Sequence, residues 1–217
     1  MFKDRKEAGQ KLADKLRTYA KQNAVVLALP RGGVVTGSEI ARMLELPLDI
    51  VAVRKIGHPA SPEYAIGAVD ENGTTILNEA ETKVVGQSWL KEETEQQKRE
   101  AKRRSDAYRE GREPPNLAGK VVIIVDDGIA TGLTMRLAVR AAKAQKPEKI
   151  IVAVPVAPAG PLRSLKDEGA NETIVLEPPE EFMGAVGAHY ATFEQIEDDE
   201  VIKLMRLAYG ERNTHKN

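Results

Sequence analysis

The fold of this chain is decided by the stretch Val121-Val122-Ile123-Ile124-Val125-Asp126-Asp127-Gly128-Ile129-Ala130-Thr131-Gly132-Leu133-Thr134-Met135. It begins with an uninterrupted run of β-branched residues, which predicts a strand buried on both faces of a parallel sheet. Two carboxylates, two glycines and two threonines follow, and then an Ala/Leu/Arg-rich stretch of helical composition begins. The order strand, polar turn and helix predicts a ligand site at the end of the strand.

The polar turn has the chemistry of a monophosphate site. Gly128 and Gly132 let the backbone approach a ligand, and the amides of residues 130–134 lie at a helix N-terminus, where free N–H groups and the helix dipole favour an anion. Thr131 and Thr134 add hydroxyl donors. The pattern is neither Gly-x-x-x-x-Gly-Lys-Ser/Thr nor Gly-x-Gly-x-x-Gly, so a Walker phosphate loop and a dinucleotide turn are excluded.

Asp126 and Asp127 must have another role, because ionised carboxylates accept hydrogen bonds and donate none. They suit a pair of sugar hydroxyls or the shell of a metal ion. The turn is therefore expected to hold a sugar phosphate from both ends. An ordinary strand-to-helix connection, in which an aspartate caps the helix, is the alternative that the residue types leave open.

The segment 125–134 resembles the phosphoribosyl-pyrophosphate signature of the type I phosphoribosyltransferases, in which two acids and a Thr-Gly phosphate loop follow a hydrophobic strand. Residues 29–33 (Leu-Pro-Arg-Gly-Gly) resemble the pyrophosphate loop after the first strand of that family. Residues 54–69 resemble a subgroup of predicted phosphoribosyltransferases whose acceptor is unassigned. The resemblance covers nearly the whole chain. It implies the type I phosphoribosyltransferase fold: α/β, with a parallel twisted sheet flanked by helices, a projecting hairpin and long helix, and a small C-terminal hood.

The resemblance also implies a reaction, the transfer of ribose 5-phosphate from phosphoribosyl pyrophosphate to a nitrogen acceptor, a nucleobase, with release of pyrophosphate. Asp126 and Asp127 would bind the ribose hydroxyls and help to hold Mg²⁺, partly through water and the bound pyrophosphate. Arg31 would meet the pyrophosphate and, with the two acids, forms the expected catalytic set. The other expected substrate-binding residues are Gly32, Gly33, Arg54, Lys55, Gly128, Ile129, Ala130, Thr131, Gly132, Leu133, Thr134 and Phe182.

Several of these positions have a second interpretation. A surface salt bridge is the alternative for Arg31. Phe182 is the candidate for stacking on the acceptor base, and a hydrophobic plug between sheet and hood is its alternative. Ala130 stands where 6-oxopurine enzymes place an acid, which disfavours a 6-oxopurine acceptor. His189 is expected to be structural and His58 to decorate a loop, and neither is assigned a role in the chemistry.

Residues 1–217 are expected to form one domain, because a chain of this length with 41% hydrophobic residues can bury one substantial core. Within it, residues 57–115 are expected to form a flexible hairpin and helix insertion, and residues 177–217 to contribute to the hood. The expected strands are 24–29, 48–53, 121–125, 149–156 and 172–176, with a hairpin of 65–69 and 74–77. The expected helices are 5–20, 34–46, 87–109 and 132–145.

Composition limits the partners. The net charge of −1 gives no general attraction to nucleic acid, and the absence of cysteine excludes disulfides and thiol catalysis. The basic residues at 98–104 are interleaved with glutamates and lack aromatic partners, so a solvated helix face is favoured over a nucleic-acid patch. No run approaches the ~18 apolar residues of a membrane span. A cytoplasmic homodimer acting in nucleotide salvage, without nucleic-acid or membrane partners, is expected.

Two other functions stay open. The first is a non-catalytic regulator on the same fold that binds phosphoribosyl pyrophosphate or a nucleotide as a signal. Arg31 favours turnover over this alternative, because a sensor has no need to stabilise a departing pyrophosphate. The second is a phosphatase or kinase that uses Asp126 or Asp127 directly on phosphate, and the lack of a P-loop lysine disfavours it.

Overall fold

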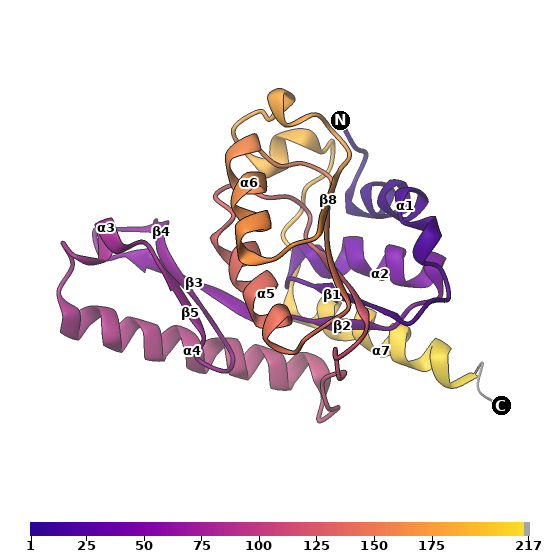
Figure 1. The fold of residues 1–217 in the computed structure, drawn as a ribbon, viewed down its shortest axis with the longest axis horizontal. Coiled ribbons are helices and arrows are strands. Elements are labelled where there is room, and N and C mark those ends of the chain that lie inside the picture. Colours follow the sequence, from indigo (N-terminus) through magenta and orange to yellow (C-terminus); the bar gives the residue numbers. More distant parts are fainter. Residues whose placement is uncertain (215–217) are drawn as a thin grey trace.

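The computed structural model describes residues 1–214, built around a parallel five-stranded sheet (Figure 1). The strand order is β2-β1-β6-β7-β8, and every neighbouring pair is parallel. The strands are β1 (Ala24–Ala28), β2 (Leu48–Ile50), β6 (Val121–Val125), β7 (Lys149–Val154) and β8 (Glu172–Val175). The expected α/β fold with a parallel sheet flanked by helices is confirmed.

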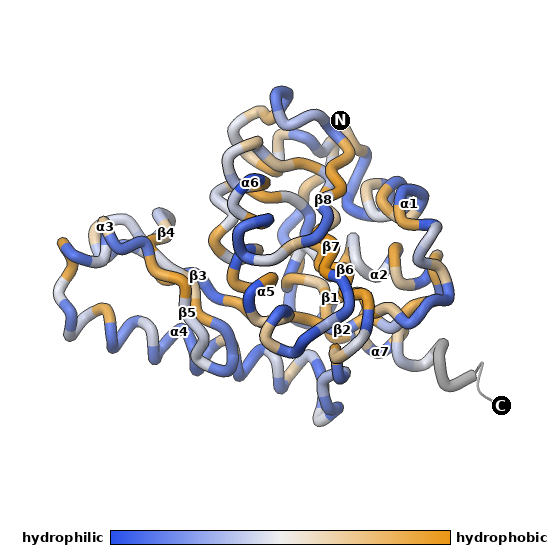
Figure 2. The backbone as a smooth tube through the Cα atoms, viewed as in Figure 1, coloured by the Kyte–Doolittle hydropathy of each residue, from blue (hydrophilic) through white to orange (hydrophobic). Residues whose placement is uncertain are grey.

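Helices cover both faces of this sheet. The helices α1 (Arg5–Lys15), α2 (Gly32–Leu44) and α7 (Asp198–Thr214) share one buried cluster with alternate residues of the strands, whereas α5 (Leu133–Ala144) and α6 (Ala159–Glu168) share the other. The hydrophobic residues accordingly concentrate in the central strands (Figure 2). Among residues 1–214, no helix is long and apolar enough to cross a membrane.

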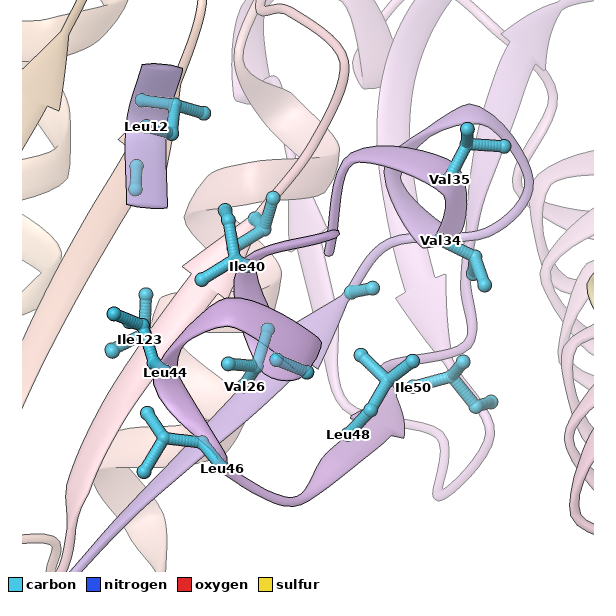
Figure 3. Packing of buried hydrophobic residues seen from close by; sticks show 14 of the residues in the cluster. Leu12, Val26, Val34, Val35, Ile40, Leu44, Leu46, Leu48, Ile50 and Ile123 are labelled. Carbon is cyan, nitrogen blue, oxygen red and sulfur yellow. The ribbon is translucent and has the colours of Figure 1, made fainter. Parts of the chain in front are cut away.

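Alternation along the strands produces the two clusters. Val26 of β1 and Ile123 of β6 are register partners and point to the α2 face, where they lie among Ile40 and Leu44 (Figure 3). All four of these side chains are at most 2% exposed. Burying such a side chain stabilises the fold by roughly 1.5–3 kcal/mol relative to leaving it exposed. Packing on this face therefore supports the loops that follow β1 and β6.

An arm projects from the sheet (Figure 1). It consists of a three-stranded antiparallel sheet followed by two helices, and the long helix α4 runs beside the strands. Its elements are β3 (Val53–His58), β4 (Ser61–Asp70), β5 (Thr75–Leu77), α3 (Glu79–Thr82) and α4 (Gln87–Arg109). The expected hairpin and long helix are present, and the hairpin has a third strand that was not expected.

Several expected boundaries differ from the observed ones, and two elements end clearly earlier than expected. The strand expected over 48–53 ends at Ile50, and the chain then leaves the parallel sheet and starts β3 in the arm. The helix expected over 5–20 ends at Lys15 and is followed by a 3-10 turn, η1 (Arg17–Tyr19). A 3-10 turn keeps apolar residues at nearly helical spacing, so the pattern of Leu12, Leu16 and Tyr19 could not distinguish the two.

Residues after β8 cross the carboxyl edge of the sheet before α7. They contain two short 3-10 turns, η2 (Pro179–Glu181) and η3 (Val186–His189). The chain start is tied to this segment, because Phe2 N donates to the His189 carbonyl at 2.7 Å and Ala191 N donates to the Phe2 carbonyl at 2.8 Å. We call residues 177–197 the hood segment. α7 itself packs against α2 and α4.

Candidate functional site

The turn after β6 and the loop after β1 meet at the carboxyl edge of the sheet. Ala28 and Val125 are register partners at the ends of their parallel strands, and Leu29 N donates to the Val125 carbonyl at 2.9 Å. The two motifs that resemble a ribose-binding pair and a pyrophosphate loop are therefore adjacent, although about 95 residues separate them in the chain.

Gly32 and Gly33, the first residues of α2, allow this contact. A Cβ atom at Gly32 would lie 1.9 Å from Oδ2 of Asp127, and one at Gly33 would lie 2.9 Å from Oδ1 of Asp126. Any larger residue would displace the carboxylates. The peptide bond between Pro30 and Arg31, just before these glycines, is cis.

The surroundings of Asp126 disfavour its charged form. Its side-chain Oδ1 accepts a hydrogen bond from the Asp127 backbone N–H at 2.8 Å. Burial raises the pKa of Asp126 well above its ordinary value, and the neighbouring charge of Asp127 adds to the effect. A cation or a set of hydroxyl donors placed at this carboxylate would relieve both costs.

Asp127 has a charged partner that sequence reasoning missed. Arg5 Nε donates to Asp127 Oδ2 at 2.6 Å, and the two side chains are only 9% and 16% exposed. Arg5 belongs to the buried side of α1 together with Ala8 and Leu12. A cation at apolar positions of the helical repeat was the signal that could have identified it, because Arg is almost never buried without a partner.

The Tyr190 side chain holds the backbone of Asp127. Its hydroxyl donates to the Asp127 carbonyl oxygen at 2.6 Å. Burial, followed by the charge of Asp127, raises the pKa of Tyr190, so the phenol remains a donor at neutral pH. Tyr190 lies in the hood segment, which therefore reaches the acid pair directly.

The remainder of the turn is shaped as the sequence predicts. Gly132 is the N-cap of α5 with φ of 82°, a conformation that favours glycine. Within residues 1–214, no backbone acceptor meets the amides of Ala130, Thr131 and Gly132. Ile129 is 3% exposed and its N–H donates to the Val156 carbonyl at 2.9 Å, so neither its side chain nor its amide is open to a ligand.

The hood segment covers the start of this turn. A Cβ atom at Gly128 would lie 2.5 Å from Val186 Cγ1. Thr131 is exposed, and Leu133 and Thr134 are half-buried in the first turn of α5. The turn is thus closed on its hood side and open at its amides.

Arg31 forms the salt bridge that was its alternative interpretation. Its Nη1 donates to Glu197 Oε2 at 3.1 Å and lies 3.7 Å from Asp198 Oδ1. The Tyr108 hydroxyl donates to Asp198 at 2.6 Å, and this hydrogen bond lowers the pKa of Asp198. Binding of a pyrophosphate by Arg31 would exchange one acidic partner for another.

Arg54 and Lys55 lie inside β3 and not, as expected, at the end of the second strand. Arg54 Nε donates to Gln97 Oε1 of α4 at 3.0 Å. Burial lowers the pKa of Arg54, and the charges of Arg104 and Arg31 lower it further. Arg104 of α4 was expected on a solvated face, but its charge also acts on Arg54.

Phe182 and His189 form a stacked pair in the hood segment, with ring centroids 5.4 Å apart. His189 is buried, its Nε2 accepts from the Met183 N–H at 3.0 Å, and its Nδ1 lies 2.5 Å from Glu177 Oε2. The structural role expected for His189 fits these contacts. Phe182 packs beside the apolar cluster that includes Tyr190, in agreement with the plug interpretation.

Two further features lie elsewhere. His58 Nδ1 accepts from the Ala60 N–H at 3.1 Å in the turn between β3 and β4, so it shapes that turn. A cavity of about 450 Å³ lies between β2, the turn after β4, the end of α4 and α5. Asp49, Arg109 and Leu117 line it, and the acid pair does not.

Comparisons with known proteins show the family of the chain. The family model "Phosphoribosyl transferase domain" matches residues 3–188. Proteins named "Putative phosphoribosyl transferase" from two strains of Mycobacterium tuberculosis, CDC 1551 / Oshkosh and H37Rv, are 38% identical over 211 residues, which is 96% of this chain. The alignment covers 47% of each, so the chain spans about half the length of these curated relatives.

A solved structure is similar over nearly the whole chain. The crystal structure of TT1426 from Thermus thermophilus is 40% identical with a TM-score of 0.78, and the match covers 94% of this chain and 97% of that one. The family model alone covers most of the described residues. The chain therefore belongs to the phosphoribosyl transferase domain family.

Proposed function

We propose that this protein is a phosphoribosyltransferase that transfers ribose 5-phosphate from phosphoribosyl pyrophosphate to a nitrogen atom of a nucleobase and releases pyrophosphate. The contact of Asp126 and Asp127 with Gly32 and Gly33 supports the proposal most strongly. A donor with a phosphate at one end and a pyrophosphate at the other needs an anion-binding loop on each side of its ribose. The two loops meet at the acid pair, where the ribose would lie.

Each part of the donor has a complementary group. The 5-phosphate would lie in the turn of residues 128–134 and accept hydrogen bonds from the amides of residues 130–134 and the hydroxyls of Thr131 and Thr134. The ribose hydroxyls would donate to Asp126 and Asp127, and the pyrophosphate would meet Arg31 and the backbone of Gly32 and Gly33, near the charge of Arg54. Because positive charge develops on the sugar as pyrophosphate departs, fixed donors at the leaving group favour the transition state.

Magnesium fits as a shared ion. Carboxylate oxygens are preferred Mg²⁺ ligands. Among the side chains that the structure describes, no group of three or more His, Asp and Glu could hold a metal ion, and Arg5 already occupies one oxygen of Asp127. Asp126 and Asp127 would therefore supply part of the shell, and water and pyrophosphate oxygens the rest. When bound, the ion would offset the charge of the leaving pyrophosphate.

The acceptor would enter beneath the hood segment. We propose that it is a nucleobase, with Phe182 as the candidate for contact with its ring and Ala130 disfavouring a 6-oxopurine. The same proposal places the protein in the cytoplasm, in nucleotide salvage, as a homodimer without nucleic-acid or membrane partners.

A panel assay tests the transfer. The protein is incubated with phosphoribosyl pyrophosphate, Mg²⁺ and one base at a time (adenine, hypoxanthine, guanine, uracil or orotate), and released pyrophosphate is measured. We expect release with one acceptor, and a loss of about 10²–10³-fold in kcat for Arg31→Met, the range seen when one preorganised donor to a developing anion is removed. The control reaction omits the base.

The second candidate is a regulator that binds the donor or a nucleotide without turnover. One observation favours it: Arg31 is paired with Glu197, so its charge is already satisfied. Saturable donor binding together with silence across the whole base panel would support this candidate and contradict the transferase.

A further inference from the structure

Arg5 lies where three parts of the molecule meet. Its Nε donates to Asp127 Oδ2 at 2.6 Å, and its Nη1 donates to the Glu194 carbonyl at 2.8 Å. The central carbon of its guanidinium group lies 3.8 Å from the centroid of the Phe193 ring. One side chain of α1, only 9% exposed, thus contacts the acid pair and the hood segment together.

These contacts use the guanidinium group in a way that few side chains could copy. Nε meets the Asp127 carboxylate, Nη1 meets the Glu194 carbonyl oxygen, and the flat face of the group lies on the Phe193 ring. Arginine is suited to this combination because its group is planar, carries several donors in fixed directions and is always charged. A lysine at position 5 could keep the charge but could not keep all three contacts.

The space around Arg5 is also closed. A Cβ atom at Gly32 would lie 2.9 Å from Arg5 Nε and 1.9 Å from Asp127 Oδ2. The guanidinium group, the carboxylate and the first turn of α2 are therefore in mutual contact. Movement of Arg5 would move the carboxylate relative to the loop that carries Arg31.

The hood segment holds Asp127 by a second route. Tyr190 donates to the Asp127 carbonyl oxygen at 2.6 Å, and its ring lies 5.0 Å from that of Phe193, centroid to centroid. Phe193 in turn lies under Arg5. The side chain and the backbone of Asp127 are thus both fixed by residues 190–194 and Arg5.

We propose that Arg5 is a positioning residue of the donor site, which orients Asp127 and makes donor binding depend on the hood segment. It takes Oδ2 of the carboxylate and leaves Oδ1 to face the ribose hydroxyls. This inference rests on the proposed function, because it assigns Arg5 to a donor that binds at the acid pair. Arg5 itself does not touch the reacting atoms.

The test is a double-mutant cycle on donor affinity. Phosphoribosyl pyrophosphate with Mg²⁺ is titrated into the wild-type protein, Arg5→Met, Asp127→Asn and the double variant, and heat is measured. We expect Arg5→Met to weaken donor binding about 10–100-fold, the range for residues that orient a ligand-binding side chain. In the Asp127→Asn background the same change should cost less than about twofold, because Arg5 acts through Asp127. Equal losses in both backgrounds would indicate a general structural effect and contradict the proposal.

Two conservative variants keep the test informative if Arg5→Met folds poorly. Arg5→Lys retains the charge and should recover part of the lost affinity. Phe193→Leu retains an apolar side chain in the hood and removes the ring beneath the guanidinium group, and it should weaken donor binding although Phe193 lies outside the acid pair. Wild-type affinity for Phe193→Leu would overturn the dependence on the hood segment.

Arg17→Met is the matched control, because Arg17 also lies near the chain start and pairs with Asp14 in an exposed i,i+3 salt bridge. It should bind the donor as the wild type does. Absence of donor binding by the wild-type protein would refute the proposed function itself. If the wild-type protein binds the donor, and Arg5→Met and Arg5→Lys bind it with the same affinity, only the role of Arg5 is refuted.

Discussion

At the scale of single residues, the site depends on a residue small enough to let the acid pair approach and on a cation that offsets its charge. Gly32 leaves the space that the Asp127 carboxylate fills, and Arg5 compensates the charge of that carboxylate. The acid pair, the two glycines and the polar turn could be predicted, because their residue types are unusual at the end of a strand. Burial of Arg5 could be suspected from its helical position, but its partner could not be predicted, because Asp127 is 122 residues away and no local pattern contains that contact.

A methyl group at position 32 should disrupt the site. Gly32→Ala places a Cβ atom where Asp127 Oδ2 now lies, so the carboxylate must move and break its contact with Arg5. We expect donor affinity to fall at least about tenfold, as when an orienting contact is lost. Gly160→Ala is the control, because that Cβ would meet open space within α6. It should retain affinity and gain up to about 1 kcal/mol of stability. Equal affinities for both variants would contradict the assigned contact.

The raised pKa of Asp126 predicts that this group lowers the free energy of unfolding of the ligand-free protein as pH rises. The unfolded chain releases this proton near pH 3.9, whereas the folded protein releases it at higher pH. The free energy of unfolding contributed by this group therefore falls as pH rises from about 3.9 through the folded pKa. Asp126→Asn removes the charge, and its side-chain oxygen can still accept the Asp127 N–H.

We therefore expect Asp126→Asn to have a higher Tm than the wild type at pH 7, a difference that disappears towards pH 4, while donor binding is weakened. Thermal unfolding measured across this pH range provides the check. A lower Tm for the variant at pH 7 would show that the carboxylate is stabilised in the free protein.

At the scale of elements, buried charges join the arm to the sheet. Arg109 at the end of α4 donates to Asp49 of β2 at 3.1 Å, to Glu71 at 3.0 Å and to the Ile50 carbonyl at 2.9 Å. Asp49 and Arg109 are 1% and 8% exposed. Burial raises the pKa of Asp49, although the charge of Arg109 opposes the shift.

Removal of this arginine should be costly. Arg109→Met would leave the Asp49 carboxylate buried without its cation, and we expect a loss of about 3–5 kcal/mol in the free energy of unfolding. Lys102→Met, also on α4, removes an exposed i,i+4 pair with Asp106 and should change stability by no more than about 0.5 kcal/mol. Urea unfolding at pH 7 distinguishes the two variants. A loss below about 1 kcal/mol for Arg109→Met would mean that other contacts dock the arm.

Some elements could be predicted from the pattern of apolar residues in the sequence, and others could not. β6 and β7 were predictable because buried parallel strands are continuous apolar runs. β3 was missed because Arg54, Lys55 and Gly57 interrupt its apolar residues, and its pairing with β4 is a tertiary contact. α4 was predicted with its observed ends, but its charged composition hid the burial of Arg109.

At the scale of the whole molecule, parallel topology brings the parts of the site together. Strands β1 and β6 are neighbours, so the loops that follow them share one edge, and this placement could be predicted from the order of elements. The attachment of the hood segment to the chain start could not, because Phe2 and residues 189–191 are joined by backbone hydrogen bonds that leave no sequence pattern.

A ligand that bridges these parts should stabilise the entire fold. At a free donor concentration of 100 times Kd, binding adds about 2.7 kcal/mol to the free energy of unfolding. For a chain of this size, that corresponds to a rise in Tm of roughly 5–11 °C. Thermal scans with phosphoribosyl pyrophosphate and Mg²⁺ should show this rise, and removal of the metal with EDTA should abolish most of it. An identical rise with EDTA would contradict the assignment of Mg²⁺.

The donor site is tested most directly by a calorimetric titration of phosphoribosyl pyrophosphate with Mg²⁺ into the wild-type protein and into the Asp126→Asn, Asp127→Asn double variant. We expect saturable binding of one donor per chain by the wild type and an affinity at least about tenfold weaker in the double variant, with Gly160→Ala as a control that binds normally. No wild-type binding, or equal affinity in the wild type and the double variant, would contradict the claim that the acid pair and the loop after β1 hold one phosphorylated ribose between them.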